Sequence, residues 1–326
     1  MSIVIKEIDI KNPAEWDSFV DESYNGTIFH KLGFLQYHPE ERFTFTNLAF
    51  YEKEELIAVI PGGLVNGVYK SPIGASYGGF VTKTYEYSVV EQIIDTFLNH
   101  IKCSNVKQIQ ITAPPYVYSL EEGEVIDFVL KYRGFDERHH LISNIKLLWN
   151  IKGELLDTFS SMHKRAVAKS YKLGVSVEIN DDYESFYNIL LENKKKFNVL
   201  PTHTLDEIKK IKRLFPESLK LFMAYDKNKV PVAGILVFVC NKTTLLTFYI
   251  AHYYSRQELR AVNRLFYEIS LWGIENGYHY LDLGISMDTS STNVMEPSRS
   301  LIFFKEGIGS RGFKRTTYQY DFGKDL

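Results

Sequence analysis

Two segments of the chain repeat one pattern of apolar and polar residues. Residues 48–60 and residues 222–234 each contain an apolar run, a short charged break and a second apolar run. Apolar runs of this length, separated by a few turn-forming residues, are typical of strand hairpins. Each segment is therefore predicted to form a strand, a charged turn and a second strand.

An amphipathic helix is predicted after each hairpin. Apolar residues there recur every three or four positions, which places them on one face of a helix. The first set is Val89, Ile93, Phe97 and Ile101, and the second set is Leu265, Ile269, Trp272 and Ile274. A short apolar run follows each helix, at residues 108–111 and 280–283, and is predicted to be a strand.

Each half is expected to close with a further helix, an Arg-Gly-Phe turn and a final strand. The turns are residues 133–135 and 311–313. The offset between matching landmarks is 174 residues for Tyr51 and Tyr225, 172 for Ile111 and Leu283, and 178 for Gly134 and Gly312.

Landmarks in one order at a near-constant offset favour internal duplication, with chance similarity between two α/β domains as the alternative. The predicted fold class is α/β with a mixed, only partly parallel sheet in each half. The element order expected in each half is β-α-α-β-β-β-α-β-α-β. The joint is expected near Asn150 to Gly153, which gives domains 1–150 and 151–326.

Length and charge agree with two ordinary globular domains. The chain has 326 residues, of which 45% are hydrophobic and 24% are charged. Either half is long enough to bury a core of its own. The net charge of −2 gives no overall field that would favour DNA or an anionic membrane, so a polyanion site would have to be a local patch.

The chain lacks the signals of export and of a metal site. No window approaches about 18 uninterrupted apolar residues, and the N-terminus is charged within a few residues. Cys103 and Cys240 lie far apart and are expected to be buried, reduced thiols. His139, His140 and His163 show no ligand spacing. We therefore expect a cytoplasmic protein without a membrane span or a metal.

Three stretches resemble the tandem-GNAT group that contains the Fem peptidyltransferases and the FemAB-like acetyltransferases. Residues 303–309, Phe-Phe-Lys-Glu-Gly-Ile-Gly, resemble the Phe-Lys-x-x-Phe-Gly signature of that group, with Ile308 in place of the second aromatic. Residues 165–175 are similar to the basic helix that opens the second domain of the family. Residues 280–284 are similar to its strand that ends in an acidic residue and a glycine.

This resemblance implies two tandem GNAT-like domains and an acyltransferase. The family moves an acyl group from acyl-CoA, or an aminoacyl group from aminoacyl-tRNA, onto an amine. The acceptor is expected to be a small-molecule amine, a nucleotide-sugar or another cell-envelope precursor, held in the first domain. Peptidoglycan bridge synthesis and N-acylation of a capsule or surface sugar stay open. So does a catalytically inactive protein that only binds, because residues 255–261 contain no glycine where the CoA loop of the family would fall.

Lys305 is the main catalytic candidate. It lies in an apolar, aromatic helix, where a partly desolvated ammonium could stabilise an oxyanion. The resemblance gives the family lysine that kind of role, with the neighbouring aromatic, here Phe304, packed on the donor. The alternative is a surface lysine. At the offset of 178, the first-half counterpart of Lys305 is Asp127.

Two groups of basic residues are candidates for binding the phosphates of the donor. Arg165, Lys169 and Lys172 are spaced to share one helical face, and a solvated face is the alternative. A second group precedes and opens the central helix, where guanidinium groups join the helix amides. Its members are Arg256, Arg260 and Arg264.

Acceptor binding is expected at a glycine-rich loop in the first half and at one strand in the second. In residues 71–80, Gly78 and Gly79 would let backbone amides face a ligand and Tyr77 could stack on it, although a tight bend would need the same residues. Tyr249 lies on the strand that carries acyl recognition in GNAT relatives, and a core tyrosine is equally consistent.

Two more residues are candidates for handling protons. Asp282 ends a predicted strand at the carboxyl side of the sheet, where it could orient the acceptor amine. A hydrogen-bonded structural aspartate is the alternative. His203 precedes a capping box at Thr204 and Glu207 that does not itself require a histidine, so His203 is a candidate base near neutral pH.

Overall fold

The computed structural model describes residues 3–104, 106–147, 154–196 and 198–325. The chain divides into two compact units. Unit 1 consists of Met1–His140 and Lys314–Leu326, and unit 2 consists of Leu141–Phe313. The joint expected at residues 150–153 lies outside the described residues.

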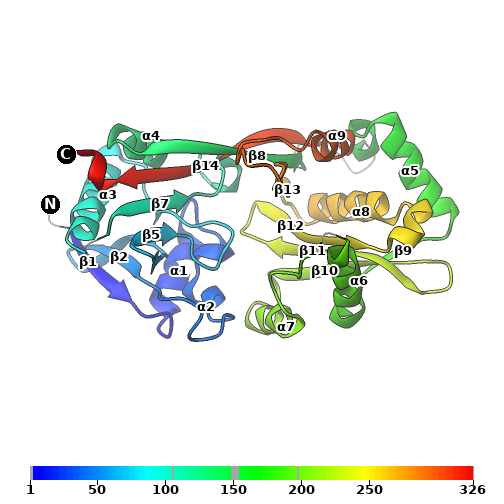
Figure 1. The fold of residues 1–326 in the computed structure, drawn as a ribbon, viewed down its shortest axis with the longest axis horizontal. Helices are drawn as coiled ribbons and strands as arrows, with labels where there is room; N and C mark the ends of the chain where they lie inside the picture. Colours follow the sequence, from blue (N-terminus) through cyan, green and yellow to red (C-terminus); the bar gives the residue numbers. More distant parts are fainter. Residues whose placement is uncertain (1–2, 105, 148–153, 197, 326) are drawn as a thin grey trace. The chain divides into compact units, whose positions relative to one another are not determined.

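Unit 1 combines two sheets with helices (Figure 1). Its helices are α1 (Ala14–Glu22), α2 (Leu32–Leu35), α3 (Tyr87–Lys102) and α4 (Val125–Tyr132). Its strands are β1 (Ile3–Ile8), β2 (Asn47–Glu52), β3 (Glu55–Ile60), β4 (Gly63–Val65), β5 (Val68–Ser71), β6 (Val81–Thr82) and β7 (Gln108–Thr112), with parts of β8 (Asp136–Lys146) and β14 (Arg311–Asp321). One sheet has the order β1-β2-β3-β6, and β5 pairs in parallel with β7 in the other.

The hairpin and helix predicted for the first half are both present. The turn between β2 and β3 uses Lys53 and Glu54, which both have positive φ. The turn has only two residues, and both are exposed, so their charged side chains stay solvated. In α3 the predicted apolar face packs into the core of unit 1, where Ile93, Phe97 and Ile101 are buried. Local periodicity therefore fixed this part of the fold.

Unit 2 is a twisted sheet with helices on its faces (Figure 1). Its helices are α5 (Ser161–Lys172), α6 (Tyr183–Lys195), α7 (Leu205–Leu214), α8 (Ala261–Glu275) and α9 (Arg299–Gly307). Its own strands are β9 (Ser176–Ile179), β10 (Leu219–Tyr225), β11 (Pro231–Val239), β12 (Thr244–His252) and β13 (Tyr280–Ile285). The expected element order runs from β9 to β14, and α5 precedes it.

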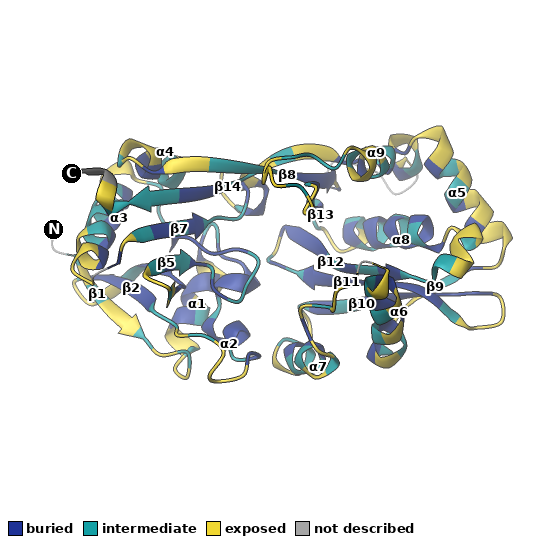
Figure 2. Cartoon of the chain, viewed as in Figure 1, coloured by how far each residue is buried: buried dark blue, intermediate teal, exposed yellow. Residues whose placement is uncertain are grey.

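The core of unit 2 lies between α8 and this sheet. Leu265 and Ile269 of α8 are fully buried and belong to the same cluster as Leu245 of β12 and Leu281 of β13. In Figure 2, β11 is dark blue over nearly its whole length, in agreement with its burial on both faces. Burial on both faces is typical of a central strand covered by helices, here α8 and α6.

The final strand of each half of the sequence pairs with a strand of the other half. β8 starts in unit 1, and its residues 142–146 pair antiparallel with β13 of unit 2. β14 starts in unit 2, and its residues 317–321 pair antiparallel with β7 of unit 1. We expected each half to close with its own strand. Both strands have 11 residues, about twice the usual strand length, so each can take part in both units.

The turns that precede these strands correct the predicted alignment of the halves. Gly134 ends α4 with φ +92°, and Gly309 follows α9 with φ +88°. The amides after each helix bond back in the same way, from Phe135 to Leu130 and from Ser310 to Lys305. The true offset is therefore 175, and residues 311–313 begin β14 rather than forming a turn. The counterpart of Lys305 is Leu130, and not Asp127.

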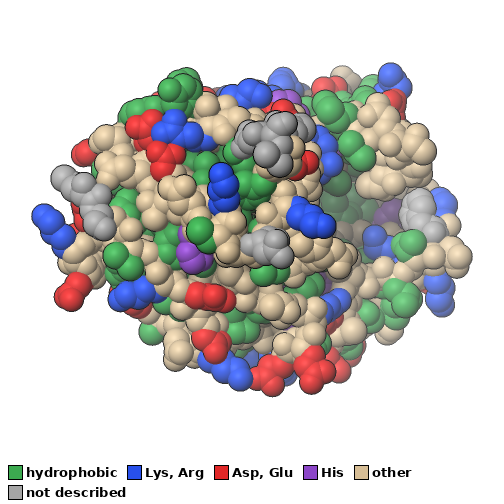
Figure 3. All heavy atoms as spheres, turned by 60° about the vertical axis from the view of Figure 1, so that its left-hand side comes forward, with side chains coloured by type: hydrophobic (Ala, Val, Ile, Leu, Met, Phe, Trp, Pro, Cys, Tyr) green, Lys and Arg blue, Asp and Glu red, His purple; other side chains and the backbone are tan. Residues whose placement is uncertain are grey.

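Three other expectations can be compared with the structure. Cys240 is buried, but Cys103 is exposed because it caps the C-terminal end of α3. Among the described residues, no helix is long and apolar enough to cross a membrane. On the face shown in Figure 3, basic and acidic side chains are interspersed, as the near-zero net charge suggested.

Candidate functional site

The candidate site begins where two parallel strands of unit 2 separate. β12 and β13 pair only from Thr244–Tyr280 to Leu246–Asp282, although both strands continue further. Thr247 marks the separation, because its hydroxyl donates to the carbonyl of Asp282 (3.2 Å). Ligands of α/β proteins commonly bind at the carboxyl ends of parallel strands, so the space beyond Leu246 is a candidate binding site.

A pocket of about 430 Å³ lies beside the end of β12 and the start of α8. Its wall combines apolar side chains from the sheet and helices with polar residues from the loop before α8 and from α6, β12 and α8. The lining residues are Asn193, Val232, Ile250, His252, Arg256, Gln257, Arg260, Ala261, Val262, Asn263, Phe266, Leu301 and Phe304. An apolar pocket with a few polar groups is the usual form of a small-molecule site.

Arg260 gives the loop before α8 a conformation that glycine usually provides. It occupies the N-cap position of α8 with φ +54°, in the left-handed region. No side chain caps the helix, so the amides of its first turn have no side-chain acceptor among the described residues. Arg256 and Arg260 are both exposed and line the pocket. The predicted phosphate loop therefore keeps its left-handed turn without a glycine.

Arg264, the third predicted phosphate-binding residue, does not line the pocket with Arg256 and Arg260. Its Nε donates to Glu268 (2.6 Å), and its guanidinium lies 3.2 Å from the centre of the Tyr171 ring. Its Nη1 is 3.5 Å from the carbonyl of Val175. These contacts join α8 to α5 and to the residue that precedes β9.

Phe304 and Asn263 lie on the pocket wall and are both held by His163. The ring of Phe304 packs edge-on against His163, with the centroids 5.1 Å apart. The Asn263 side chain donates to Nδ1 of His163 (2.6 Å). Burial lowers the pKa of His163, which favours the neutral ring that accepts this bond. The pocket wall is therefore fixed by a contact with α5.

Lys305 is buried, with 3% of its surface exposed. Its ammonium donates to the carbonyls of Gly284 (2.8 Å) and Ile285 (2.8 Å) and to the hydroxyl of Ser286 (3.1 Å). An ammonium has three N–H groups, so all three have partners here. Burial lowers its pKa to about 8, and the negative charge of Asp282 acts in the opposite direction. The sequence suggested a partly desolvated ammonium available to an oxyanion, and the structure instead directs the ammonium at the end of β13.

Asp282 belongs to the same bend in β13. Its carboxylate accepts the amide of Gly284 (2.7 Å), which has φ +72°, at a break in the register with β8. Asp282 is fully buried. In the bulge, Asp282 thus binds a backbone amide and Lys305 binds the backbone carbonyls. The structure agrees with the hydrogen-bonded alternative, and a role toward an acceptor amine stays a prediction.

His203 and Tyr249 form a separate pair in unit 2. The Tyr249 hydroxyl is 3.0 Å from Nδ1 of His203 and accepts the His203 amide at 3.2 Å. Both side chains are buried, and burial raises the pKa of Tyr249. Neither residue lines the pocket at α8. The basic residues Arg165, Lys169 and Lys172 of α5 are exposed and also lie outside that pocket.

The predicted acceptor loop lies in unit 1. Tyr77 is buried edge-on between Phe29 and Tyr118, so in this structure it packs rather than presenting a free face. The amide of Gly78 donates to the carbonyl of Thr112 (2.9 Å), and Gly79 has φ +95°. These contacts match the tight-bend alternative.

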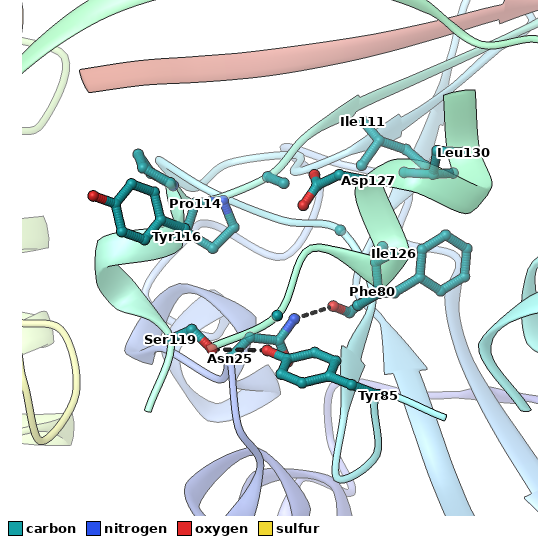
Figure 4. A pocket seen from close by; sticks show the side chains of 14 residues that line it. Asn25, Phe80, Tyr85, Ile111, Pro114, Tyr116, Ser119, Ile126, Asp127 and Leu130 are labelled. Atoms are coloured by element: carbon teal, nitrogen blue, oxygen red, sulfur yellow. Dashed lines mark hydrogen bonds between the residues drawn. The ribbon is translucent and has the colours of Figure 1, made fainter. Parts of the chain in front are cut away.

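Gly79 also borders a small pocket of about 50 Å³ in unit 1 (Figure 4). Asp127 points into it from α4, and the side chains of Asn25, Tyr85 and Ser119 lie on another wall. The Tyr318 hydroxyl donates to Asp127, whose pKa is raised by burial. Among the described residues, no cluster of His, Cys, Asp and Glu could hold a metal ion.

Sequence reasoning missed His252, Asn193 and Gln257. His252 ends an apolar strand and carries no motif, and Asn193 lies near the end of a helix 59 residues earlier. Gln257 follows His252 by five residues, but only the folded chain brings Asn193 to the same pocket, so no signal in the sequence linked Asn193 to the other two.

No family model and no curated protein matches this chain. Solved structures do match. FemX has 13% identity and a TM-score of 0.73, with 99% of this chain and 98% of that chain covered. L-PGS from Bacillus licheniformis has 12% identity and a TM-score of 0.63, with 96% and 93% covered. A tandem GNAT protein from the clavulanic acid biosynthesis pathway has 8% identity and a TM-score of 0.55, with 98% of both chains covered.

These likenesses show the fold. The chain is a mixed α/β protein with two tandem GNAT-like domains, as the sequence predicted. The resemblance to the FemAB-like tandem-GNAT group is confirmed at the level of structure.

Proposed function

We propose that the chain is a GNAT-type acyltransferase. It takes an acyl group from acyl-CoA, or an aminoacyl group from aminoacyl-tRNA, and transfers it to an amine on a cell-envelope precursor or a sugar. Unit 2 binds the donor, and unit 1 contributes to acceptor binding. The tandem-GNAT fold and its likeness to FemX and L-PGS support the class of reaction.

The observation that carries the proposal is the pocket beside the separated strands. Donors of both kinds contain phosphate, and the pocket places Arg256 and Arg260 beside the uncapped first turn of α8. Guanidinium groups form strong, charge-assisted hydrogen bonds with phosphate, and helix amides add partial positive charge. The apolar wall, which includes Ile250 and Phe304, suits the uncharged part of a donor.

The reaction would be a direct attack by a neutral amine on the donor carbonyl. The new C–N bond forms as the carbonyl becomes an oxyanion. The C–S bond to CoA or the C–O bond to the ribose then breaks, and the departing sulfur or oxygen takes up the proton that the amine lost. Beyond Leu246, the edge of β12 that faced β13 has no strand partner among the described residues, so its amides are candidates for stabilising the oxyanion. Lys305 stays a candidate only if its bond to Ser286 is exchanged during the reaction.

The test is donor binding measured by calorimetry. CoA and an aminoacyl-tRNA are titrated into the protein, into Arg260→Ala and into Arg213→Ala. Arg213 is an exposed residue of α7 outside the pocket, which makes it a matched control. Loss of one charge-assisted bond costs about 1.5–3 kcal/mol, so Arg260→Ala should bind about 10- to 150-fold more weakly. Failure of both donors to bind, or equal affinity of the two variants, would contradict the assignment.

A non-catalytic binding protein is the second candidate. The saturated N–H groups of Lys305 favour it, because they leave the expected oxyanion-stabilising group without a free donor. The two candidates differ in turnover. Consumption of a bound donor in the presence of amine acceptors supports the acyltransferase, and tight binding without consumption supports the binding protein.

A further inference from the structure

His252 is held at the pocket by its backbone rather than by its ring. The side chain of Asn193 donates to the carbonyl of His252 and lies 3.4 Å from its amide, so one amide group contacts both backbone groups. The imidazole takes no part in this clamp, and His252 is one of the residues that line the pocket. Its Nε2 accepts a bond from the side chain of Gln257 (3.2 Å), an exposed residue that a ligand can displace.

Basic residues occur both in the lining of this pocket and close to the imidazole. Arg256 and Arg260 line the same pocket. Lys196 at the end of α6 lies 4.0 Å from the centre of the Tyr254 ring, and that ring lies 4.7 Å from the imidazole. None of the described residues that line the pocket is acidic. Among the described residues, the lining of the pocket therefore carries two cationic side chains and no carboxylate.

We propose that His252 is a phosphate-binding residue of this pocket, and that it takes up a proton when the phosphate of the donor enters. The inference rests on the proposed function, since it treats the pocket as the donor site. It adds a third side chain to the two arginines and makes donor affinity depend on pH. Displacement of Gln257 would leave Nε2 free to bond the phosphate.

The direction of the pH effect follows from the charges. Burial, followed by the charge of Lys196, lowers the pKa of His252 in the free protein. A bound phosphate brings negative charge next to the ring and favours the protonated form, which raises the pKa. Binding and proton uptake are then linked, and affinity falls as the pH rises between the two pKa values. Full coupling of one proton changes the dissociation constant about tenfold per pH unit.

The experiment is calorimetric titration at pH 6 and pH 8 with two probes. Dephospho-CoA is the first, because its diphosphate carries no proton near neutral pH, whereas the 3′-phosphate of CoA titrates near pH 6. An RNA acceptor-stem minihelix is the second, and it tests the tRNA source of the same phosphate chemistry. We expect the probe that binds to do so about tenfold more weakly at pH 8, with proton uptake measured from buffers of different ionisation enthalpy.

Two variants separate the role of His252 from other causes. In His252→Gln the affinities at the two pH values should agree within about twofold. In His279→Gln, which changes a histidine outside the pocket, the parent behaviour should persist. If His252→Gln does not fold, the pKa of His252 is followed in the parent protein by NMR of ¹³C-labelled histidine, and should rise when the probe binds.

The outcomes are distinguishable. If neither probe binds the parent protein at either pH, the proposed donor site is wrong and the inference fails with it. If a probe binds but its pH dependence is unchanged in His252→Gln, or if the pKa of His252 does not rise, only the inference fails.

Discussion

The substitution Lys305→Met tests whether Lys305 is mainly a structural group. Methionine is unbranched and of similar length, so it removes the ammonium with little change in volume. The sequence alone suggested that truncating this residue to alanine would change stability by less than about 1 kcal/mol if it lined an open cleft. Burial of the side chain removes that condition.

The expected loss of stability comes from the groups that the ammonium serves. The carbonyls of Gly284 and Ile285 each accept one of its bonds, at 2.8 Å. A buried acceptor that loses its donor costs about 1–3 kcal/mol, so the two carbonyls together give about 2–6 kcal/mol. The buried charge of Lys305 itself destabilises the parent protein, as its lowered pKa indicates, and removal of the charge offsets part of this cost. The lower end of the range is therefore expected at pH 7.

The assay is urea denaturation of both proteins between pH 7 and pH 10. The folded pKa of Lys305 is about 8 against an ordinary value of 10.5. Between these values the unfolded chain binds more protons than the folded chain. The stability of the parent relative to Lys305→Met should therefore rise with pH in this window, by up to about 1.4 kcal/mol per pH unit.

A stability difference below about 1 kcal/mol with no dependence on pH would refute this reasoning. Turnover provides the second measurement. If Lys305→Met keeps its stability but turns over about 10²–10³-fold more slowly, the catalytic role expected from the sequence gains support.

Three further predictions use other parts of the chain. Burial lowers the pKa of His30 to about 4, so the unfolded chain binds a proton at a higher pH than the folded chain does. The free energy of unfolding, measured by chemical denaturation, should therefore fall by about 3 kcal/mol as the pH drops from 6.5 to 4. The His30→Gln variant should lack this contribution. Gly309→Ala should lower the melting temperature more than Gly134→Ala, since both have φ near +90° but only the new Cβ at residue 309 would lie 2.5 Å from a neighbouring hydroxyl. Arg165→Ala and Lys169→Ala should keep the fold and leave CoA binding unchanged, because neither residue lines the pocket. Both variants should bind tRNA more weakly than the parent, in a salt-dependent way. Equal tRNA affinity in calorimetry would show that the α5 face is only solvated.

The sequence determined the parts of this protein that depend on local periodicity. The apolar positions at Ile93 and Phe97 recur with the helical period and form the buried face of α3. The charged break at Lys53 and Glu54 became the turn between β2 and β3. Repetition of these patterns in both halves was enough to predict two tandem α/β domains, because secondary structure in strongly patterned segments follows from nearby residues.

Tertiary structure decided everything that depends on partners distant in the sequence. An apolar strand pattern says which face is buried but not which strand it pairs with, so the exchange of β8 and β14 between the units could not be predicted. Likewise, the helix containing Lys305 was predicted, but the direction of its ammonium depends on carbonyls some 20 residues away. The pocket lies at the end of β12, past the last residue that pairs with β13, and His252 enters it from a strand whose sequence shows only an apolar run. Pairing and side-chain direction are settled by contacts between segments, which one sequence read from end to end does not contain.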